Sequence, residues 1–361
     1  MRECQGTVVD MLDQEGGTSQ EGAAGQGLGG DTLVVTRGGI RPISELAGEH
    51  ALLIPHFSAH SRNGVGAFPP IEVRHLGANQ LFRVALRRCR QTTFVDAAPA
   101  QRWFVVGKKR VPERWYGRKQ VCYPITEERA TTGLVVGDRL RGVRAAVPCR
   151  PVEVPFGVAQ GFVFGDGSKG TNERPATLSV YNVDKDGPLL PYFAAHDIRT
   201  TPRGKLIYGL PRTWKAVPDI AESRSFLVSW LAGYFAADGS VTKAGQAVLY
   251  SAVLDNILFA RDVMAVCGIR YGAVLSRTRT GFGVARELHS INLDARDVSE
   301  WFFIIEHHKS RVEGRPAPEP RNIDWVVESV EDCGAGEVFG AVVPGARAVG
   351  LADGLLTGAL G

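Results

Sequence analysis

SWLAGYFAADGS, residues 229–240, has the pattern of an apolar helix that runs into a carboxylate. Gly233 lies among alanines, and such small residues let a second helix backbone approach closely. Asp238 falls at the helix end and Gly239 follows it, a residue that commonly stops helices by adopting a left-handed conformation. A helix C-terminus carries partial negative charge, so a carboxylate there is unfavourable unless a cation lies beside it. The stretch alone is also compatible with an ordinary buried helix and its cap.

A second copy of this pattern decides between the two interpretations. Residues 159–168 read AQGFVFGDGS, with Gly161 in the place of Gly233 and Asp166 in the place of Asp238. An internal duplication predicts two similar structural units. We therefore expect a pseudo-two-fold axis, with both aspartates close to it.

The sequences that follow the two copies also match in outline. Residues 176–199 and 247–270 each begin with a short β-branched run and continue as an amphipathic helical stretch that ends in Ile-Arg. We expect the two units to pack through Gly161 and Gly233, because glycine allows the closest approach of two helices.

Two carboxylates at the ends of paired helices predict a divalent-metal site. Asp166 and Asp238 supply carboxylate oxygens, and we expect the main-chain carbonyls of Gly165 and Ala237 to add further oxygen ligands. Such ligands suit Mg²⁺ or Mn²⁺, and Mg²⁺ is usually held by one or two carboxylates, waters and substrate phosphates. The arrangement suits phosphodiester hydrolysis, in which metal ions stabilise the attacking and leaving oxygens. Two-fold symmetry suits a substrate with two antiparallel strands.

LAGYFAADG and AQGFVFGDG resemble the paired signature helices of the LAGLIDADG homing endonucleases, in the single-chain form with two repeats. The resemblance covers about residues 155–310, within a domain that we place at 151–310. It implies an α/β (α+β) domain that cleaves double-stranded DNA with Mg²⁺. It also implies a long recognition site and curved antiparallel sheets that lie in the major groove.

The same resemblance implies basic residues near the metals. Lys205, in TTPRGKLIYGLP, lies at about the family's distance after the first helix, and its alternative role is that of a solvent-facing strand lysine. The second repeat offers Arg277 and Arg279 instead, in YGAVLSRTRTGF. These two arginines alternate along a predicted strand and so share one face, where we expect them to contact DNA.

The chain carries a net charge of +4 that is unevenly spread over its 361 residues. Residues 27–150 hold 20 basic and nine acidic side chains, and the excess favours a polyanionic partner. The alternative is a solvated strand edge guarded by charged residues. The candidate DNA-contacting residues in this segment are Lys108, Lys109, Arg110, Arg118 and Lys119.

The segments around the predicted nuclease resemble the two halves of an intein's protein-splicing domain, the all-β Hint fold. GDTLVVTRGGIRPISELAGE, which begins at Gly30, reads as a strand, a Gly-Gly turn, a second strand and a short helical turn. We expect the Hint halves at 27–150 and 323–361, a Pro-rich linker at 311–322 and a disordered Gly-rich lead at 1–26.

The splicing chemistry is missing at each position that the intein pattern requires. Gly27 replaces the first nucleophile, Ala98 the motif threonine and Gln101 the motif histidine. Ala359 replaces the asparagine that cyclises, and Leu360 replaces the downstream nucleophile. Acyl transfer needs an activated hydroxyl or thiol with a positioned base. The shell is therefore expected to be inactive in splicing.

The six cysteines form no CxxC pair, so neither a zinc finger nor a disulfide framework is indicated, and buried free thiols are expected. The sequence has no apolar run of about 18 residues, which predicts no membrane association. We expect a monomer in the cytoplasm, with access to DNA.

These observations favour a site-specific double-strand DNA endonuclease on a splicing-inactive Hint scaffold. One alternative is a DNA-binding protein or RNA maturase that keeps the fold without cutting, although binding alone does not require Asp166 and Asp238. A second alternative is an active splicing element, which Gly27, Gln101 and Ala359 argue against.

Overall fold

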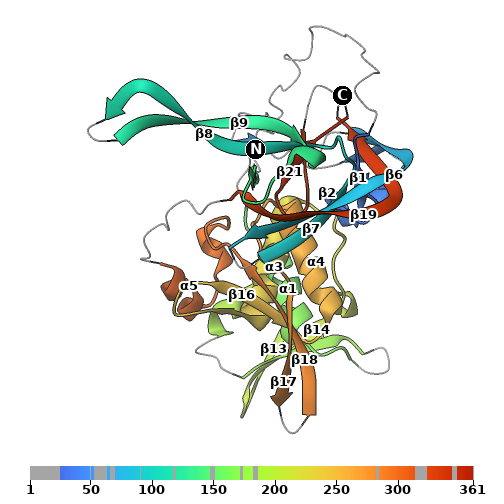
Figure 1. Cartoon of the computed structure of the whole chain (residues 1–361). Coiled ribbons are helices and arrows are strands. Elements are labelled where there is room, and N and C mark those ends of the chain that lie inside the picture. The colour runs from blue at the N-terminus through green and yellow to red at the C-terminus, as the bar shows by residue number, and fades with distance from the viewer. Residues whose placement is uncertain are drawn as a thin grey trace, which may run out of the picture.

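The chain has a mixed α/β architecture with large antiparallel sheets, and the helices of the middle part are gathered below the largest sheet (Figure 1). A computed structural model describes most of it. The described ranges are 25–48, 50–52, 63–65, 70–89, 91–116, 119–146, 151–170, 174–181, 186–281, 284–313, 323–343 and 348–360. The predicted lead, apart from residues 25 and 26, and most of the predicted linker lie outside these ranges.

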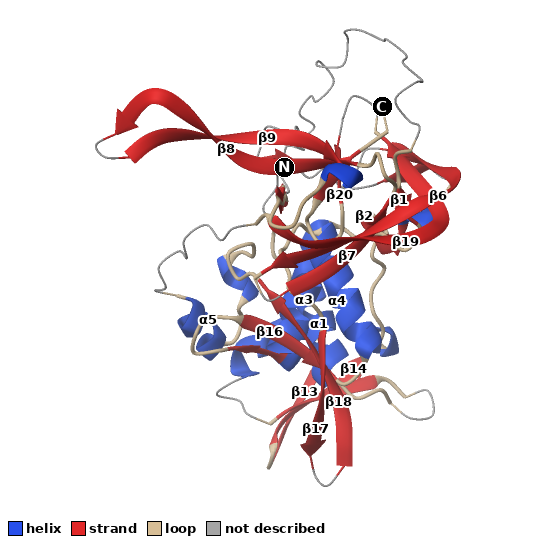
Figure 2. Cartoon of the chain, viewed as in Figure 1, coloured by secondary structure: helices blue, strands red, loops and turns tan. Residues whose placement is uncertain are grey.

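Strands from both ends of the chain share one ten-stranded sheet, drawn in red in the upper part of Figure 2. β6 and β19 are its longest neighbours, paired antiparallel from Val326↔Arg87 to Val342↔Glu72. The strands of this sheet are β1 (Leu28–Gly29), β4 (His50–Leu52), β6 (Pro70–Arg88), β7 (Gln91–Ala97), β8 (Arg102–Tyr116), β9 (Lys119–Ala130), β10 (Arg139–Leu140), β19 (Trp325–Val342), β20 (Ala348–Gly350) and β21 (Leu356–Gly358).

The first predicted hairpin is confirmed. β2 (Leu33–Thr36) pairs with β3 (Gly39–Pro42), and the 3-10 helix η2 (Ile43–Leu46) follows directly. Gly39 takes a φ of +104°, a conformation that favours glycine at this turn. The remaining small elements of the shell are β5 (Asn63–Val65), which pairs with β11 (Arg144–Ala146), and the 3-10 helix η3 (Thr131–Gly133).

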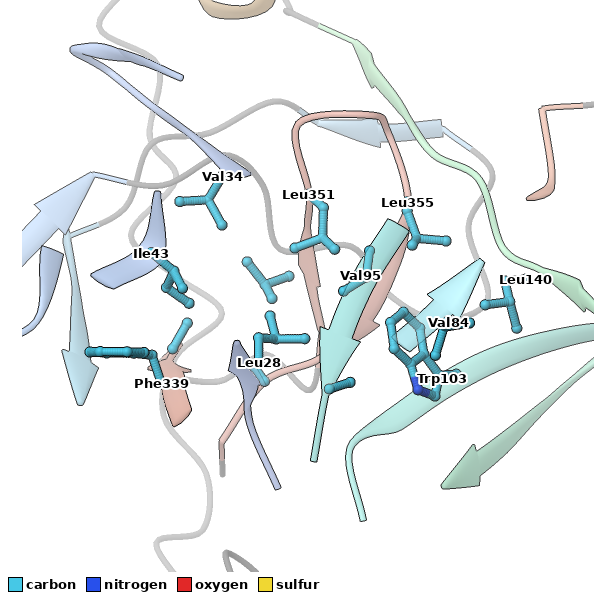
Figure 3. Packing of buried hydrophobic residues seen from close by; sticks show 14 of the residues in the cluster. Leu28, Val34, Ile43, Val84, Val95, Trp103, Leu140, Phe339, Leu351 and Leu355 are labelled. Carbon is cyan, nitrogen blue, oxygen red and sulfur yellow. The ribbon is translucent and has the colours of Figure 1, made fainter. Parts of the chain in front are cut away.

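One hydrophobic core draws on both ends of the chain, as Figure 3 shows. Leu28 and Trp103, from the N-terminal segment, belong to the same cluster as Phe339 and Leu355, from the C-terminal segment. The two segments therefore fold together although the whole middle part of the chain separates them. We refer to them together as the shell.

The middle of the chain forms two similar units with their own cores. The first unit contains α1 (Pro155–Asp166), β12 (Ala176–Val180), η4 (Gly187–Phe193), β13 (Asp197–Thr201), β14 (Gly204–Leu210) and η5 (Arg212–Lys215). The second contains α3 (Arg224–Asp238), β15 (Gly239–Val241), β16 (Ala247–Ser251), α4 (Leu254–Val266), β17 (Leu275–Gly281), β18 (Val284–Leu293), η6 (Glu300–Phe302) and α5 (Glu306–Val312).

The two units have the same strand order. The second sheet runs β15-β16-β18-β17, and the first runs β12-β14-β13 with an isolated bridge between Ser168 and Thr177 in the place of the β15–β16 pairing. α1 begins with Pro155, whose missing N–H costs nothing in the first turn. α3 begins at the cap Ser223, whose hydroxyl accepts a bond from the N–H of Phe226.

The end of the predicted helical stretch in the first unit is an expectation that the structure corrects. Among the described residues after β12 the chain forms the short 3-10 helix η4, and Ile198-Arg199 lies on β13 instead of at a helix end. Pro188 and Pro191 explain the difference, because neither offers an N–H to an α-helical ladder. In the second unit α4 forms as expected, with Ile269-Arg270 just beyond it.

The expectation of buried thiols is correct for Cys267 and wrong for Cys89 and Cys333, which are exposed. Cys89 lies at the turn after β6 with a φ of +58°, where the chain reverses at the surface. In the described part of the chain, every helix is too short or too polar to cross a bilayer.

Candidate functional site

The helices α1 and α3 pack backbone against backbone. A Cβ atom on Gly161 would lie 1.9 Å from the carbonyl oxygen of Trp230, and one on Gly233 would lie 2.0 Å from that of Val158. Real side chains do not tolerate such distances, so both positions require glycine. This close crossing brings the C-terminal ends of the two helices together.

The carboxylates Asp166 and Asp238 are the last residues of α1 and α3. A Cβ atom on Gly165 would lie 2.4 Å from the Cβ of Ala237 and 3.2 Å from Oδ2 of Asp238. The carboxylate of Asp238 therefore reaches across to the last turn of α1. The structure brings together the four residues that the sequence nominates as metal ligands.

The glycines that follow the aspartates do not act as predicted. Gly167 and Gly239 have φ values of −71° and −89°, which is extended backbone and not the left-handed conformation. Close packing explains why both positions are glycine. A Cβ atom on Gly167 would lie 2.5 Å from the carbonyl oxygen of Val163, and one on Gly239 would lie 2.3 Å from that of Phe235. The chain leaves each helix by folding tightly over its last turn.

Lys215 is a site residue that the sequence reasoning missed. It lies at the end of η5, and its Nζ donates to the carbonyl oxygens of Phe164 and Gly165, the latter at 3.2 Å. Burial lowers the pKa of Lys215, while the charges of Asp238 and Asp166 act to raise it. A cation thus lies at the end of α1, where its charge interacts with both carboxylates, as their unfavourable position at helix C-termini requires.

Lys205, by contrast, is not brought to the aspartates. It pairs with Val180 at the start of β14, whereas the chain leaving Asp166 joins the sheet at the bridge between Ser168 and Thr177. Val180 and Thr177 are three residues apart on β12, which corresponds to about 10 Å along a strand. β14 then runs back toward the C-terminal ends of α1 and α3. Lys215 follows the end of β14 and therefore lies at the end of α1 in place of Lys205.

The arginines of the second sheet lie on the face that points away from the helices. Ser276 pairs with the buried His289, so its neighbour Arg277 points to the opposite face, and Arg279 follows on that same face. The guanidinium of Arg277 lies 5.7 Å from the ring centroid of Tyr250. The side chain of Arg279 lies outside the part of the chain whose side chains are described.

The first sheet carries a matching pair on its corresponding face. Ile198 and Ile207 pair with each other and face the helices, so Arg199 and Tyr208 face outward. The guanidinium of Arg199 lies 4.7 Å from the ring centroid of Tyr208. Each repeat therefore presents an arginine over a tyrosine, a feature that only strand register reveals.

The basic segment of the shell forms a long ribbon. β8 and β9 extend together away from the body of the molecule in Figure 1. Lys108, Lys109 and Arg110 lie on β8 and Lys119 on β9, with side chains outside the described ones, and Arg118 lies outside the described residues altogether.

The positions that the sequence resemblance assigns to splicing converge in the shell, where a glutamine links them. The N–H of Gly27 donates to Oε1 of Gln101 at 2.9 Å, and the N–H of Ala98 donates to the carbonyl of Gly27 at 2.9 Å. Nε2 of Gln101 donates to Oγ1 of Thr357 and to the carbonyl of Gly358, at 2.7 and 2.8 Å. Both ends of the amide are satisfied, as a buried polar group requires.

The C-terminal members of this set lie in the same region. Arg102 donates to the carbonyl oxygen of Ala359, and the N–H of Leu360 donates to the carbonyl of Ala341 at 2.9 Å. Ala359 and Leu360 are both buried. The positions that the intein resemblance singles out therefore lie together in one region of the shell, and Gly27, Ala359 and Leu360 carry no side chain that could take part in acyl transfer.

The donor set at the helix ends fits a hard divalent cation. Two carboxylates and two main-chain carbonyls are all oxygen donors, which suits Mg²⁺ or Mn²⁺ better than a soft metal. Within the described ranges, His, Cys, Asp and Glu nowhere gather in a group of three or more that could hold a metal by themselves. A cation here would therefore rely on water and substrate phosphate for its other ligands, as Mg²⁺ commonly does.

No family model and no curated protein matches the sequence. Among solved structures, a mutant of the Ssp DnaB mini-intein is similar over 93% of this chain and 99% of its own, at 10% identity and a TM-score of 0.32. The N-terminal LAGLIDADG domain of DUF199/WhiA is similar over 47% of this chain and 87% of its own, at 13% identity and 0.29.

I-DmoI, solved in a complex with DNA and Mn, is similar over 45% of this chain and 98% of its own, at 12% identity and a TM-score of 0.27. The structural neighbours thus include an intein and LAGLIDADG domains. TM-scores this low carry no weight for function, which has to be argued from the residues of this chain.

Proposed function

We propose that this protein is a site-specific endonuclease that hydrolyses double-stranded DNA with Mg²⁺ or Mn²⁺, in a two-repeat LAGLIDADG domain inserted into a splicing-inactive Hint-like shell. One observation supports this most directly. Asp166 and Asp238 end two helices that cross through Gly161 and Gly233, and the ammonium of Lys215 is bound to carbonyls at the end of α1, within electrostatic reach of both carboxylates.

The chemistry of the site follows from its charges. Asp166 and Asp238, with the carbonyls of Gly165 and Ala237, would hold the metal, which when bound supplies an activated water and charge stabilisation for the phosphodiester. Lys215 would place a positive charge where the pentacovalent phosphate gathers negative charge. We assign the basic catalytic role to Lys215 in place of Lys205, because only Lys215 is close to the carboxylates.

Recognition of DNA is assigned to the outer faces of the two sheets. Arg199 and Arg277 lie on the corresponding strands β13 and β17 of the two repeats, which suits the two halves of a duplex site. Each guanidinium lies over a tyrosine ring, although Tyr208 and Tyr250 lie on strands that do not correspond. Arginine can form bidentate hydrogen bonds to guanine in the major groove. The β8–β9 ribbon would add contacts to phosphates beyond the recognised bases, without sequence preference.

The shell has no part in bond cleavage under this proposal. Gly27 lacks a nucleophile and Ala359 lacks an amide side chain, while Gln101 is held in hydrogen bonds at both ends of its amide. The protein would act as an intracellular monomer, since the two repeats in one chain already supply both aspartates.

Cleavage of a randomised double-stranded DNA library with Mg²⁺, followed by sequencing of the cut ends, tests the proposal. The expected result is one long consensus sequence at the ends, absent with the Asp166→Asn variant. A consensus enriched by binding but never cut would indicate a non-cleaving DNA-binding protein. Binding that is confined to structured RNA would indicate a maturase.

A further inference from the structure

A lysine ammonium lies where a metal ion would be expected at the end of α1. Nζ of Lys215 donates to the carbonyl oxygens of Phe164 and Gly165, two acceptors of the last helical turn. The helix end carries partial negative charge, and the carboxylates of Asp166 and Asp238 are close enough to act on the pKa of the same lysine. The ammonium is therefore held by the oxygen-rich surroundings that a divalent cation requires.

The ammonium and a divalent cation compete for these surroundings. Gly165 supplies its carbonyl to Lys215, and that carbonyl is one of the four groups assigned to the metal. Two cations a few ångströms apart repel strongly in a partly buried site, where screening by water is weak. Lys215 has a flexible side chain, so the ammonium can move away without a change of the backbone.

We propose that the Lys215 ammonium is the resident cation of this site and that a divalent metal has to displace it from the α1 carbonyls in order to bind. This inference rests on the proposed function, because it takes Asp166 and Asp238 to be metal ligands. In its displaced position the ammonium stays near the metals, where the scissile phosphate would lie. The lysine thus lowers the affinity for metal and stabilises the helix ends before metal binds.

Binding of Mn²⁺ alone to the full-length chain tests the proposal, with free Mn²⁺ measured by electron paramagnetic resonance. The Lys215→Met variant is expected to bind Mn²⁺ about tenfold or more tightly than the natural chain, because a competing charge is removed. Lys215→Arg keeps the charge and is expected to give no such gain. Lys205→Met is the matched control, since Lys205 lies away from the carboxylates, and its affinity should equal that of the natural chain.

A second measurement is the melting temperature, which does not depend on an assay of activity. In the absence of metal, Lys215→Met should melt lower than the natural chain, because a positive charge that offsets the two carboxylates and the end of α1 is then lost. Saturating Mn²⁺ should remove most of this difference in melting temperature. Lys215→Gln repeats both measurements if the methionine variant does not fold.

The outcomes separate this inference from the proposed function. If Asp166→Asn abolishes Mn²⁺ binding but Lys215→Met and Lys215→Gln bind no more tightly than the natural chain, displacement is wrong and the metal site stands. If Mn²⁺ fails to bind, or binds equally well to Asp166→Asn and Asp238→Asn, the metal site itself is wrong and the inference falls with it. Tighter binding by both neutral variants, lost again when Asp166→Asn is added, supports displacement.

Discussion

The backbone N–H of Gly27 donates a 2.9 Å hydrogen bond to Oε1 of Gln101, and this contact joins the first residue of the shell to its C-terminal strands. The same amide holds Thr357 and Gly358 through its Nε2. In this position a histidine would be expected to exchange protons near neutral pH. A neutral amide cannot, and its geometry serves to join segments that are far apart in the sequence.

The shell should not splice even when the first nucleophile is restored. Gly27→Cys puts a Cβ atom 2.2 Å from Cγ1 of Val338, at a φ of +131° that side chains rarely adopt. The expected result is a loss of about 2 kcal/mol in the free energy of unfolding, with no cleavage after Gln26 or after Ala359. Urea denaturation measures the first effect, and intact mass after incubation with thiol measures the second.

Gly48→Cys is the control for this experiment. Gly48 also has a positive φ, but no atom lies within 4 Å of its ideal Cβ position, so any additional cost at Gly27 reports the close packing. Equal losses at the two positions would show that packing against Val338 is not the cause. A fragment that ends at Gln26 would show that the shell still performs its first splicing step.

The crossing of α1 and α3 should be intolerant of a single methyl group. Gly161→Ala places a Cβ 1.9 Å from a backbone carbonyl, which cannot move aside as a flexible side chain can. We expect a loss of about 3 kcal/mol, at the upper end of the range for overpacked cores. Gly133→Ala, where nothing lies within 4 Å of the new Cβ, should change stability little. Both values come from chemical denaturation, and a stable Gly161→Ala variant would contradict the backbone-to-backbone packing.

The close helix pair could be predicted from the sequence, while Lys215 could not. Gly161 and Gly233 repeat within a duplicated pattern, and helix geometry converts that repeat into a shared face. Lys215 reaches the aspartates only because β14 ends at Leu210 and η5 then turns the chain toward α1. Strand ends and register depend on tertiary packing, and β12 and β14 even shift register between Ala176 and Leu178.

The placement of Lys205 also depends on strand register. Counting residues from the end of α1 places Lys205 at a plausible distance along the chain, but the strand pairing with Val180 puts it at the far end of the sheet. Residues 176–199 show a different reason why a prediction from sequence can fail. There the amphipathic pattern predicts a helix that continues to Ile198-Arg199, although two prolines in the segment lack the N–H groups that an α-helix needs.

The β8–β9 ribbon should contribute to DNA binding through its positive charge, without preference for sequence. Replacing Lys108, Lys109 and Arg110 with glutamine is expected to weaken DNA binding equally for all sequences. The slope of log K against log salt concentration should fall by about 2 to 3, if each of the three side chains contacts one phosphate. Arg41→Gln is the control, because Arg41 lies on β3 in an ion pair with Glu45 and outside the ribbon. An unchanged slope in the triple variant would remove the ribbon from the DNA interface.

Arg277, on the second sheet, should contribute to recognition of the DNA sequence. Arg277→Ala is expected to weaken binding to the selected site by about 1 to 3 kcal/mol, while binding to random DNA changes much less. Tyr250→Leu should have a smaller effect of the same kind, because the ring only orients the guanidinium at 5.7 Å. Competition binding with selected and random duplexes measures both. Equal losses on the two kinds of DNA would make Arg277 a phosphate contact.

Asp166→Asn and Asp238→Asn should each abolish strand cleavage and leave DNA binding intact. The amide keeps the size of the carboxylate, so the helix crossing is preserved, but it removes the negative charge that holds a divalent cation. Binding is expected to stay the same or to tighten slightly, because a charge that repels phosphate is lost. Asp31→Asn is the matched control, since Asp31 is an exposed carboxylate of the shell, in the turn between β1 and β2. Plasmid cleavage assays with Mg²⁺ and gel-shift titrations with Ca²⁺ measure the two properties separately.

Near-normal cutting by either helix-end variant would mean that the hydrolytic site lies elsewhere in the chain. Loss of both cutting and binding would mean that the two aspartates support the fold of the DNA-binding face and not the chemistry.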